Sequence, residues 1–302
     1  MVLSPSHNFQ TFCPLLLFFI FSLSITSCSE LTRQFWPKFW ECDDTKGNFT
    51  QNSTYDLNLA TAFSNFTSLS SSHLFSNLTI GGSHDDVTDI VYALYDCRND
   101  LTFEKCHGCV EDATRNALDL CYRHPKEGIV IYEECMLRYA NRMIFSNMEL
   151  RPNYTNCAGV KLLLDGGQIE GGVRRNLDSL IDEATSESSS SRNFAVKNGS
   201  YIAQREFYFL VQCTPDLSRA QCKECLTDAL NFTVESCASD SRLWGQIKRP
   251  SCQMRYDVEP FFNVSSDGLI PPTPSPPHIS RQPLVAIGKL YFYLFVFIFS
   301  LL

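Results

Sequence analysis

The spacing of the cysteines constrains this chain more than any other feature of its sequence. Twelve of its 14 cysteines fall into two sets of six. Successive cysteines are 55, 9, 3, 12 and 14 residues apart in the first set and 56, 9, 3, 12 and 15 apart in the second. Five steps that agree to within one residue indicate a duplicated domain of roughly 110 residues. The first set is Cys42, Cys97, Cys106, Cys109, Cys121 and Cys135, and the second is Cys157, Cys213, Cys222, Cys225, Cys237 and Cys252.

The start of the chain has the pattern of a secretory signal. Leu15–Phe21 is continuously apolar, is too short to span a bilayer, and is followed by small residues. We therefore expect residues 1–28 to be a signal peptide. Its removal would take Cys13 and Cys28 with it and leave the two matched sets of cysteines.

In a secreted chain, two matched sets of six cysteines favour disulfides over zinc ligation. Six cysteines allow fifteen pairings, and the spacing alone leaves the choice among them open. His107 lies inside the first C-x2-C, but Lys223 occupies the corresponding place in the second. We expect His107 to be a surface residue, and we predict no metal site.

The C-terminal part of the sequence predicts attachment to a membrane. Residues 263–283 form a proline-rich spacer, and residues 284–302 form a tail that is apolar apart from Lys289. Small residues followed by a spacer and an apolar tail are typical of a GPI-attachment signal, for which we choose Ser266 as the attachment residue. A transmembrane span is the alternative. No basic residue follows the tail and Lys289 would lie within the span, and both features disfavour it.

The expected ectodomain is rich in sequons and acidic. Residues 1–29 have no charged side chain and residues 269–302 have only two basic ones, so the formal charge of −8 becomes −10 over residues 30–268. This balance argues against nucleic-acid binding and against attraction to anionic lipid. Eight N-x-S/T sequons predict a glycosylated surface, at Asn48, Asn52, Asn65, Asn77, Asn153, Asn198, Asn231 and Asn263.

The local patterns predict an α+β fold of two tandem disulfide-rich domains, each with two helices packed on an antiparallel β-sheet. Ser218 and Gln221 form a capping box that opens a helix carrying Cys222 and Cys225, and Thr102 opens its equivalent. The remaining expected helices are Asp56–Phe66 and Arg174–Ala184. The expected strands are Val91–Tyr95, Gly128–Tyr132, Glu206–Val211 and Gly245–Lys248.

The C-x8-C-x2-C core in both copies resembles the plant ginkbilobin-like, or stress-antifungal, cysteine-rich repeat. The resemblance places the two repeats at residues 33–143 and 150–262. Two tandem copies behind a signal peptide resemble the cysteine-rich repeat secretory proteins. The same pair resembles the ectodomains of cysteine-rich receptor-like kinases and of plasmodesmata-located proteins. No kinase follows here, so we do not expect a complete receptor kinase.

The resemblance also implies a disulfide pairing of first to fifth, second to third and fourth to sixth cysteine. In this chain the implied pairs are Cys42–Cys121, Cys97–Cys106, Cys109–Cys135, Cys157–Cys237, Cys213–Cys222 and Cys225–Cys252.

A lectin role follows less readily from the same resemblance. The family's mannose-binding antifungal member uses an Asn directly after the first cysteine, an Arg six residues before the last, and a Glu five residues after it. The chain lacks all of these: it has Asp43, Ile129 and Ala140 in the first repeat, and Ala158, Gln246 and Asp257 in the second. Without the Asn and Arg donors, sugar hydroxyls lose their oriented partners, so mannose binding by this pocket is doubtful.

Two further sets of residues could carry recognition. Arg138 and Arg255 occupy matching places, and we expect their stems to pack on the sheet and their heads to bind local carbonyls. Of Trp36, Trp40 and Trp244, we expect at least two to pack in the core or on a sheet.

The sequence predicts a protein without catalytic residues or cofactors. No nucleophile and base show a local signature, and the six histidines are scattered. We expect a cell-surface or apoplast protein that binds an extracellular protein or a cell-wall glycan, in defence or cell-to-cell communication. The alternatives are a secreted antifungal or carbohydrate-binding protein and a plasmodesmata-located membrane protein. The ligand-binding residues are unknown.

Overall fold

The computed structural model describes residues 35–82, 89–157, 159–162, 167–187, 193–262, 264–265 and 268–269. The described residues from Pro37 onwards, which include both repeats, form one compact unit. The expected signal peptide, Ser266 and the apolar tail lie outside the described residues, as does Asn263. Among the described residues, no helix is long and apolar enough to cross a membrane.

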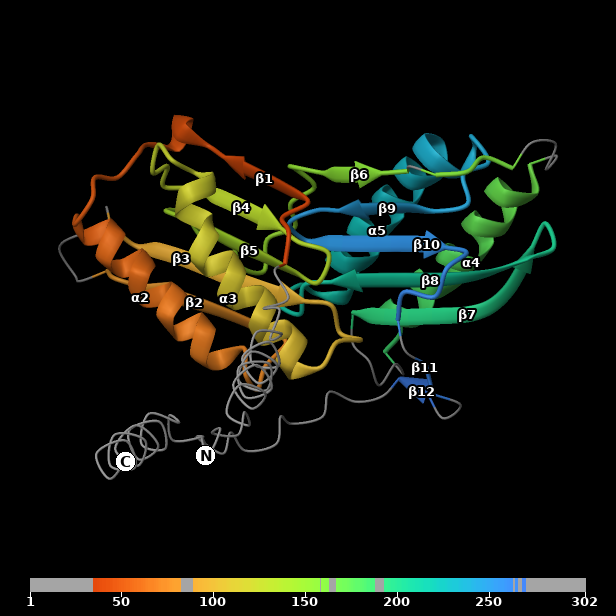
Figure 1. The fold of residues 1–302 in the computed structure, drawn as a ribbon, viewed down its shortest axis with the longest axis horizontal. Coiled ribbons are helices and arrows are strands. Elements are labelled where there is room, and N and C mark those ends of the chain that lie inside the picture. The colour runs from red at the N-terminus through yellow and green to blue at the C-terminus, as the bar shows by residue number, and fades with distance from the viewer. Residues whose placement is uncertain are drawn as a thin grey trace, which may run out of the picture. The chain divides into compact units, whose positions relative to one another are not determined.

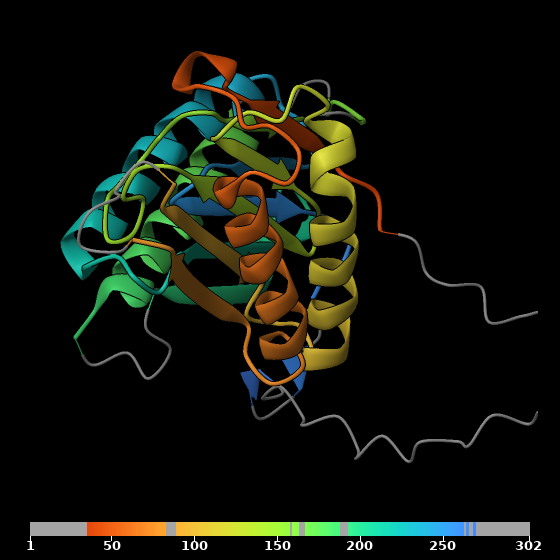
Figure 2. The same cartoon turned by 90° about the vertical axis from the view of Figure 1, so that its left-hand side faces the viewer.

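The first repeat is a five-stranded antiparallel sheet in the order β1-β4-β5-β3-β2. Helices α2 and α3 lie side by side on one of its faces (Figures 1 and 2). Its elements are β1 (Phe39–Cys42), a short 3-10 helix (Asp44–Lys46), α2 (Thr54–Leu69), β2 (Phe75–Ile80), β3 (Val91–Cys97), α3 (Phe103–Leu120), β4 (Gly128–Ile131) and β5 (Cys135–Ala140).

The second repeat has the same topology, with its sheet in the order β6-β9-β10-β8-β7 and α4 and α5 on one face (Figure 1). The predicted α+β fold of two tandem disulfide-rich domains is confirmed. The elements are β6 (Tyr154–Asn156), α4 (Gln168–Thr185), β7 (Phe194–Ile202), β8 (Arg205–Cys213), α5 (Arg219–Thr233), a π-helical turn (Val234–Ala238), β9 (Gly245–Lys248) and β10 (Cys252–Asp257). A two-residue pair follows, β11 (Val264–Ser265) with β12 (Gly268–Leu269).

The helix that carries each C-x2-C starts where the sequence predicts. Ser218 caps α5 by accepting a hydrogen bond from Gln221 N, and Gln221 Oε1 accepts one from Ser218 N at 3.1 Å, which completes the capping box. Thr102 caps α3 by accepting from Lys105 N. These caps satisfy backbone N–H groups that the first turn leaves unpaired.

The C-x2-C spacing matches the spacing of the strands beneath it. Cys106 and Cys109 stand on one face of α3, where residues three apart lie about 5–6 Å from each other. They bond to Cys97 and Cys135, which are directly opposite each other on neighbouring strands. The same arrangement recurs in the second repeat, where Cys222 and Cys225 bond to the paired Cys213 and Cys252.

The remaining disulfides, Cys42–Cys121 and Cys157–Cys237, tie the edge strand of each sheet to the segment after the second helix. All six disulfides are the pairs that the family resemblance implies. The two long loops close 79 and 80 residues, and each contributes on the order of 4 kcal/mol by restricting the unfolded chain.

A glycine facing a tyrosine recurs in both sheets. Gly128 is paired with Tyr139 across β4 and β5, and Gly245 is paired with Tyr256 across β9 and β10. A Cβ atom at these glycines would lie 2.7 and 2.8 Å from the tyrosine rings. Only glycine therefore lets each fully buried ring lie flat against the neighbouring strand.

The two repeats meet through equivalent residues. Asp96 and Gln212 each directly precede the second cysteine of their repeat, and both are buried. Gln212 Nε2 donates to Asp96 Oδ2 at 3.0 Å and to the Cys97 carbonyl at 2.9 Å, and its Oε1 accepts from Asn99 N at 3.0 Å. One glutamine thus satisfies three polar groups of the other repeat.

Charged side chains extend this junction. Lys248 Nζ donates to the Glu133 carbonyl at 2.8 Å, and Arg255 Nη1 pairs with the Glu133 carboxylate at 2.8 Å. Burial raises the pKa of Glu133, but the nearby Lys248, Arg255 and Arg98 charges outweigh it and leave the pKa lowered. Burial lowers the pKa of Lys248 to about 8. The repeats therefore meet through buried hydrogen bonds and desolvated charges.

The buried Asp96 at the junction predicts that the free energy of unfolding depends on pH, and that Asp96→Asn removes this dependence. Burial raises the pKa of the Asp96 carboxyl well above its ordinary value of 3.8, so the folded protein holds this proton more tightly than the unfolded chain does. Stability is then lost as pH rises from about 4 towards the folded-state pKa. Lys248 has a pKa of about 8 in the folded protein, so the comparison is made at pH 7 and below. An asparagine keeps an oxygen for Gln212 and carries no charge.

We expect Asp96→Asn and the wild type to have equal free energies of unfolding near pH 4. The variant should gain up to about 1.4 kcal/mol per pH unit towards pH 7, as measured by urea unfolding. Asp182→Asn, which removes an exposed carboxylate, is the control and should show no such divergence. A pH-independent difference between Asp96→Asn and the wild type would contradict the argument.

Candidate recognition surface

The positions that correspond to the mannose pocket of the family's antifungal member are largely closed. Asp43 Oδ1 accepts hydrogen bonds from the Thr45 backbone N at 3.0 Å and from the Thr45 hydroxyl at 2.5 Å. Ile129 and Ala140 are buried. In the second repeat Gln246 and Asp257 are buried, and Ala158 lies outside the described residues.

A cavity of about 180 Å³ lies beside Asp43 and Ile129, and ion pairs line it. Arg138 Nη2 lies 2.5 Å from Glu149 Oε2, and Arg142 pairs with both Glu127 and Glu149 at 2.5 and 2.7 Å. A sugar entering this cavity would compete with carboxylates for both guanidinium groups.

The electrostatics of this cluster agree with a closed network. Burial raises the pKa of Glu149, but the hydrogen bond from Arg142 and the charge of Arg138 outweigh it and leave the pKa lowered. The hydrogen bonds that Arg142 donates to Glu149 and Glu127 raise its pKa. The charges therefore stabilise each other in the absence of any ligand.

We expected the guanidinium groups of Arg138 and Arg255 to bind local carbonyls, and this prediction is wrong. Both heads bind carboxylates and not local carbonyls. Glu149, eleven residues further along the chain, pairs with Arg138, and Glu133 of the first repeat pairs with Arg255. Arg255 pairs with Glu133 of the first repeat and with Asp257, and it lies 4.2 Å from the Phe261 ring centroid. It belongs to the junction between the repeats and is not free to bind a ligand.

The tryptophan expectation is also wrong. Trp36 and Trp40 are 67% and 46% exposed, and only Trp244 is half-buried. Trp40 lies on β1, which is the edge strand of its sheet in the part of the chain that the structure describes. This exposure could not be read from the sequence, because it depends on which strand forms the edge of the sheet.

Trp40 borders an open groove of about 510 Å³ beside the Cys42–Cys121 disulfide. Tyr122, which directly follows Cys121, is 72% exposed on the same groove. Leu120 and Pro125 add apolar surface, and Glu41, Asp44 and Arg123 add charge. We call these seven residues the Trp40 groove.

The second repeat has no counterpart to these aromatic rings. Thr155 and Ala238 occupy the places of Trp40 and Tyr122, counted from the first and fifth cysteines. Both repeats form the same fold, so the fold does not require an aromatic residue at either place. Comparison of the two repeats is the sequence signal that could have singled out Trp40 and Tyr122.

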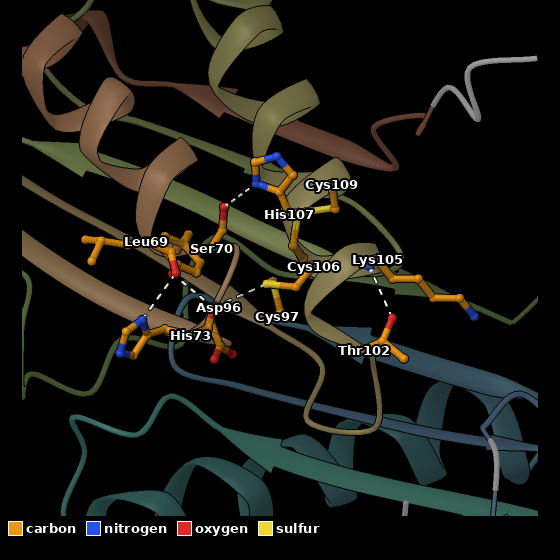
Figure 3. The surroundings of a disulfide bond; sticks show 12 residues. Leu69, Ser70, His73, Asp96, Cys97, Thr102, Lys105, Cys106, His107 and Cys109 are labelled. Carbon is orange, nitrogen blue, oxygen red and sulfur yellow. Dashed lines mark hydrogen bonds between the residues drawn. A yellow bond between two sulfur atoms is a disulfide. The ribbon is translucent and has the colours of Figure 1, made fainter. Parts of the chain in front are cut away.

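The surroundings of the Cys97–Cys106 disulfide give His107 a structural role (Figure 3). We expected His107 to be a surface residue, but it is half-buried. Its Nδ1 lies 3.1 Å from the hydroxyl of the buried Ser70. Cys106 and Cys109 on either side of it are both in disulfides. Over the ranges that the structure describes, no cluster of His, Cys, Asp and Glu could hold a metal ion.

Seven of the eight predicted glycosylation sites are among the described residues. Asn77 and Asn153 are half-buried and the other five are exposed. Attachment of glycans stays a prediction at all of them, and at Asn263. The exposed sites are Asn48, Asn52, Asn65, Asn198 and Asn231.

Comparisons with known proteins agree with this architecture. The chain is 34% identical to cysteine-rich receptor-like protein kinase 25 of Arabidopsis thaliana, over 78% of its own length and 34% of the kinase. It is also 34% identical to kinase 29 of the same plant, over 85% of its length and 37% of that kinase. The chain thus spans about a third of the length of these relatives.

Two solved structures share the fold. They are the tandem DUF26 ectodomains of the Arabidopsis thaliana cysteine-rich receptor-like proteins PDLP5 and PDLP8, with TM-scores of 0.61 and 0.60 and 23% and 21% identity. Each match covers 74% of this chain, and 100% and 97% of the respective ectodomain.

The fold is therefore that of a tandem DUF26 ectodomain, with two disulfide-stapled repeats in one unit. The family described as salt stress response/antifungal matches residues 41–142 and 168–259, which is more than half of the chain. The chain belongs to this family. The region that matches the receptor-like kinases is their ectodomain.

The cluster around Arg138 predicts a large difference between two arginine substitutions. Arg138 has only 4% of its side chain exposed. Among the ion pairs of the described residues, Arg138→Met would leave Glu149 and Glu127 paired with Arg142 alone. We expect this variant to lose about 2–4 kcal/mol in free energy of unfolding at pH 7.

Arg115→Met is the matched control, because Arg115 makes two ion pairs on the exposed side of α3 with 61% of its side chain exposed. Its loss should cost less than about 1 kcal/mol. Urea unfolding of both variants measures the difference. Equal losses would show that the buried cluster contributes no more than a surface pair.

Proposed function

We propose that this chain is a non-catalytic recognition protein of the plant cell surface, which binds an extracellular protein or a cell-wall glycan. The observation that carries the proposal is the pair of exposed aromatic side chains, Trp40 and Tyr122, on a stapled scaffold whose second repeat lacks them. Exposed Trp and Tyr beside Arg form the composition typical of binding surfaces.

The relatives support an extracellular setting for this function. The matching region of the receptor-like kinases is the ectodomain, and the two solved structures with this fold are ectodomains of receptor-like proteins. A role in defence or in cell-to-cell communication follows from this kinship. Six disulfides suit an oxidising compartment.

Binding to cell surfaces tests the function. We expect the full chain, purified from plant cells and labelled with a fluorophore, to bind saturably to isolated cell walls or to protoplasts. Reduced and alkylated protein should lose this binding, because the disulfides hold the recognition surface in shape. Absence of saturable binding to both preparations, or equal binding by the unfolded protein, would overturn the proposed function.

We further propose that a GPI anchor attached at Ser266 holds the chain at the membrane. The order of small residues, proline-rich spacer and apolar segment supports it. Phosphatidylinositol-specific phospholipase C should release the displayed full chain from intact cells, as measured by blotting the medium. Carbonate-resistant retention would instead favour a membrane span and a plasmodesmata-located protein. Release without the enzyme would favour a secreted antifungal or carbohydrate-binding protein.

A further inference from the structure

We propose that the Trp40 groove binds a neutral oligosaccharide built of pyranose rings. This inference rests on the proposed function and names both the ligand class and the site. The site is distinct from the cavity that corresponds to the family's mannose pocket, which Arg138, Arg142 and their carboxylate partners occupy.

The two aromatic rings supply the first half of the recognition chemistry. An aromatic face carries a partial negative charge, so it attracts the slightly positive C–H groups on the face of a sugar ring. Trp40 and Tyr122 both expose large ring surfaces on one open groove. Exposing apolar rings to water is unfavourable, and the second repeat has Thr155 and Ala238 at these places instead. A ligand that stacks on the rings would remove this surface from water.

The polar residues of the groove supply the second half. Asp44 Oδ2 accepts from Arg123 Nη1 at 2.9 Å, and the Arg123 guanidinium lies 5.8 Å from the Tyr122 ring centroid. These contacts hold Arg123 over one face of the Tyr122 ring, which leaves the other face and Trp40 for stacking. A guanidinium has five N–H donors and a carboxylate has several acceptor sites, so both can also bind sugar hydroxyls. An amphipathic ring with hydroxyl edges fits this alternation better than an apolar helix face does.

The charges of the groove select among sugars. Glu41, Asp44 and Arg123 together carry one net negative charge, and the expected ectodomain carries −10. Anionic glycans such as galacturonate oligomers would be repelled by this field. The field therefore excludes acidic sugars, and the expected ligand is a neutral one.

Isothermal titration of the full chain, deglycosylated so that a glycan on Asn48 does not compete, tests the assignment. The neutral probes are cellohexaose and chitohexaose, and a galacturonate hexamer is the acidic probe. We expect a neutral hexamer to bind, and Trp40→Thr and Tyr122→Ala each to weaken it by about tenfold or more. Both substitutions install the residue that the second repeat holds, so the fold should accept them, as near-ultraviolet circular dichroism will show.

Tyr201→Ala is the matched control, since Tyr201 is 75% exposed on β7 of the other repeat and should leave the affinity unchanged. The inference is overturned if neither neutral hexamer binds, if the groove variants bind as well as the control, or if the acidic hexamer binds more tightly. If the chain still binds cell walls or protoplasts saturably in any of these cases, the sugar assignment is wrong but the proposed recognition function is not. If Trp40→Thr abolishes surface binding and free sugars do not compete, the groove docks a protein and the sugar assignment is wrong.

Discussion

The match between the C-x2-C spacing and the strand spacing is the constraint on which the rest of the structure depends. Two cysteines three residues apart on a helix reach two cysteines that face each other on adjacent strands. The helix is thereby fixed over the centre of the sheet in direction and in register. Domains of this size bury a limited core, so such staples contribute a large share of the stability.

The same staples place the junction between the repeats. Asp96 and Gln212 come directly before Cys97 and Cys213, so the disulfides that fix the strand ends also fix the residues that meet across the junction. Lys248 and Arg255 add charged contacts to Glu133. The result is one compact unit in which each repeat satisfies buried polar groups of the other.

The repeats differ where the fold leaves them free to differ. Around the first and fifth cysteines the first repeat carries Trp40 and Tyr122, and the second carries Thr155 and Ala238. In the first repeat, Glu127 and Glu149 bind the arginines beside the positions that correspond to the family's mannose pocket. A duplicated scaffold with one modified copy can thus present a recognition surface without altering the core that both copies share.

The sequence by itself determined the duplication, the fold class, the capped helices and the strands β3, β4, β8 and β9, because cysteine spacing, capping residues and β-branched runs act locally. The middle strands β5 and β10 and the edge strands were not predicted. It did not determine the strand order, the edge position of Trp40 or the carboxylate partners of Arg138 and Arg255. Those features join residues far apart in the chain, such as Arg255 and Glu133, and depend on which surfaces remain uncovered once the sheets form. Only the tertiary structure decides which polar groups are buried together and which aromatic rings stay exposed to a ligand.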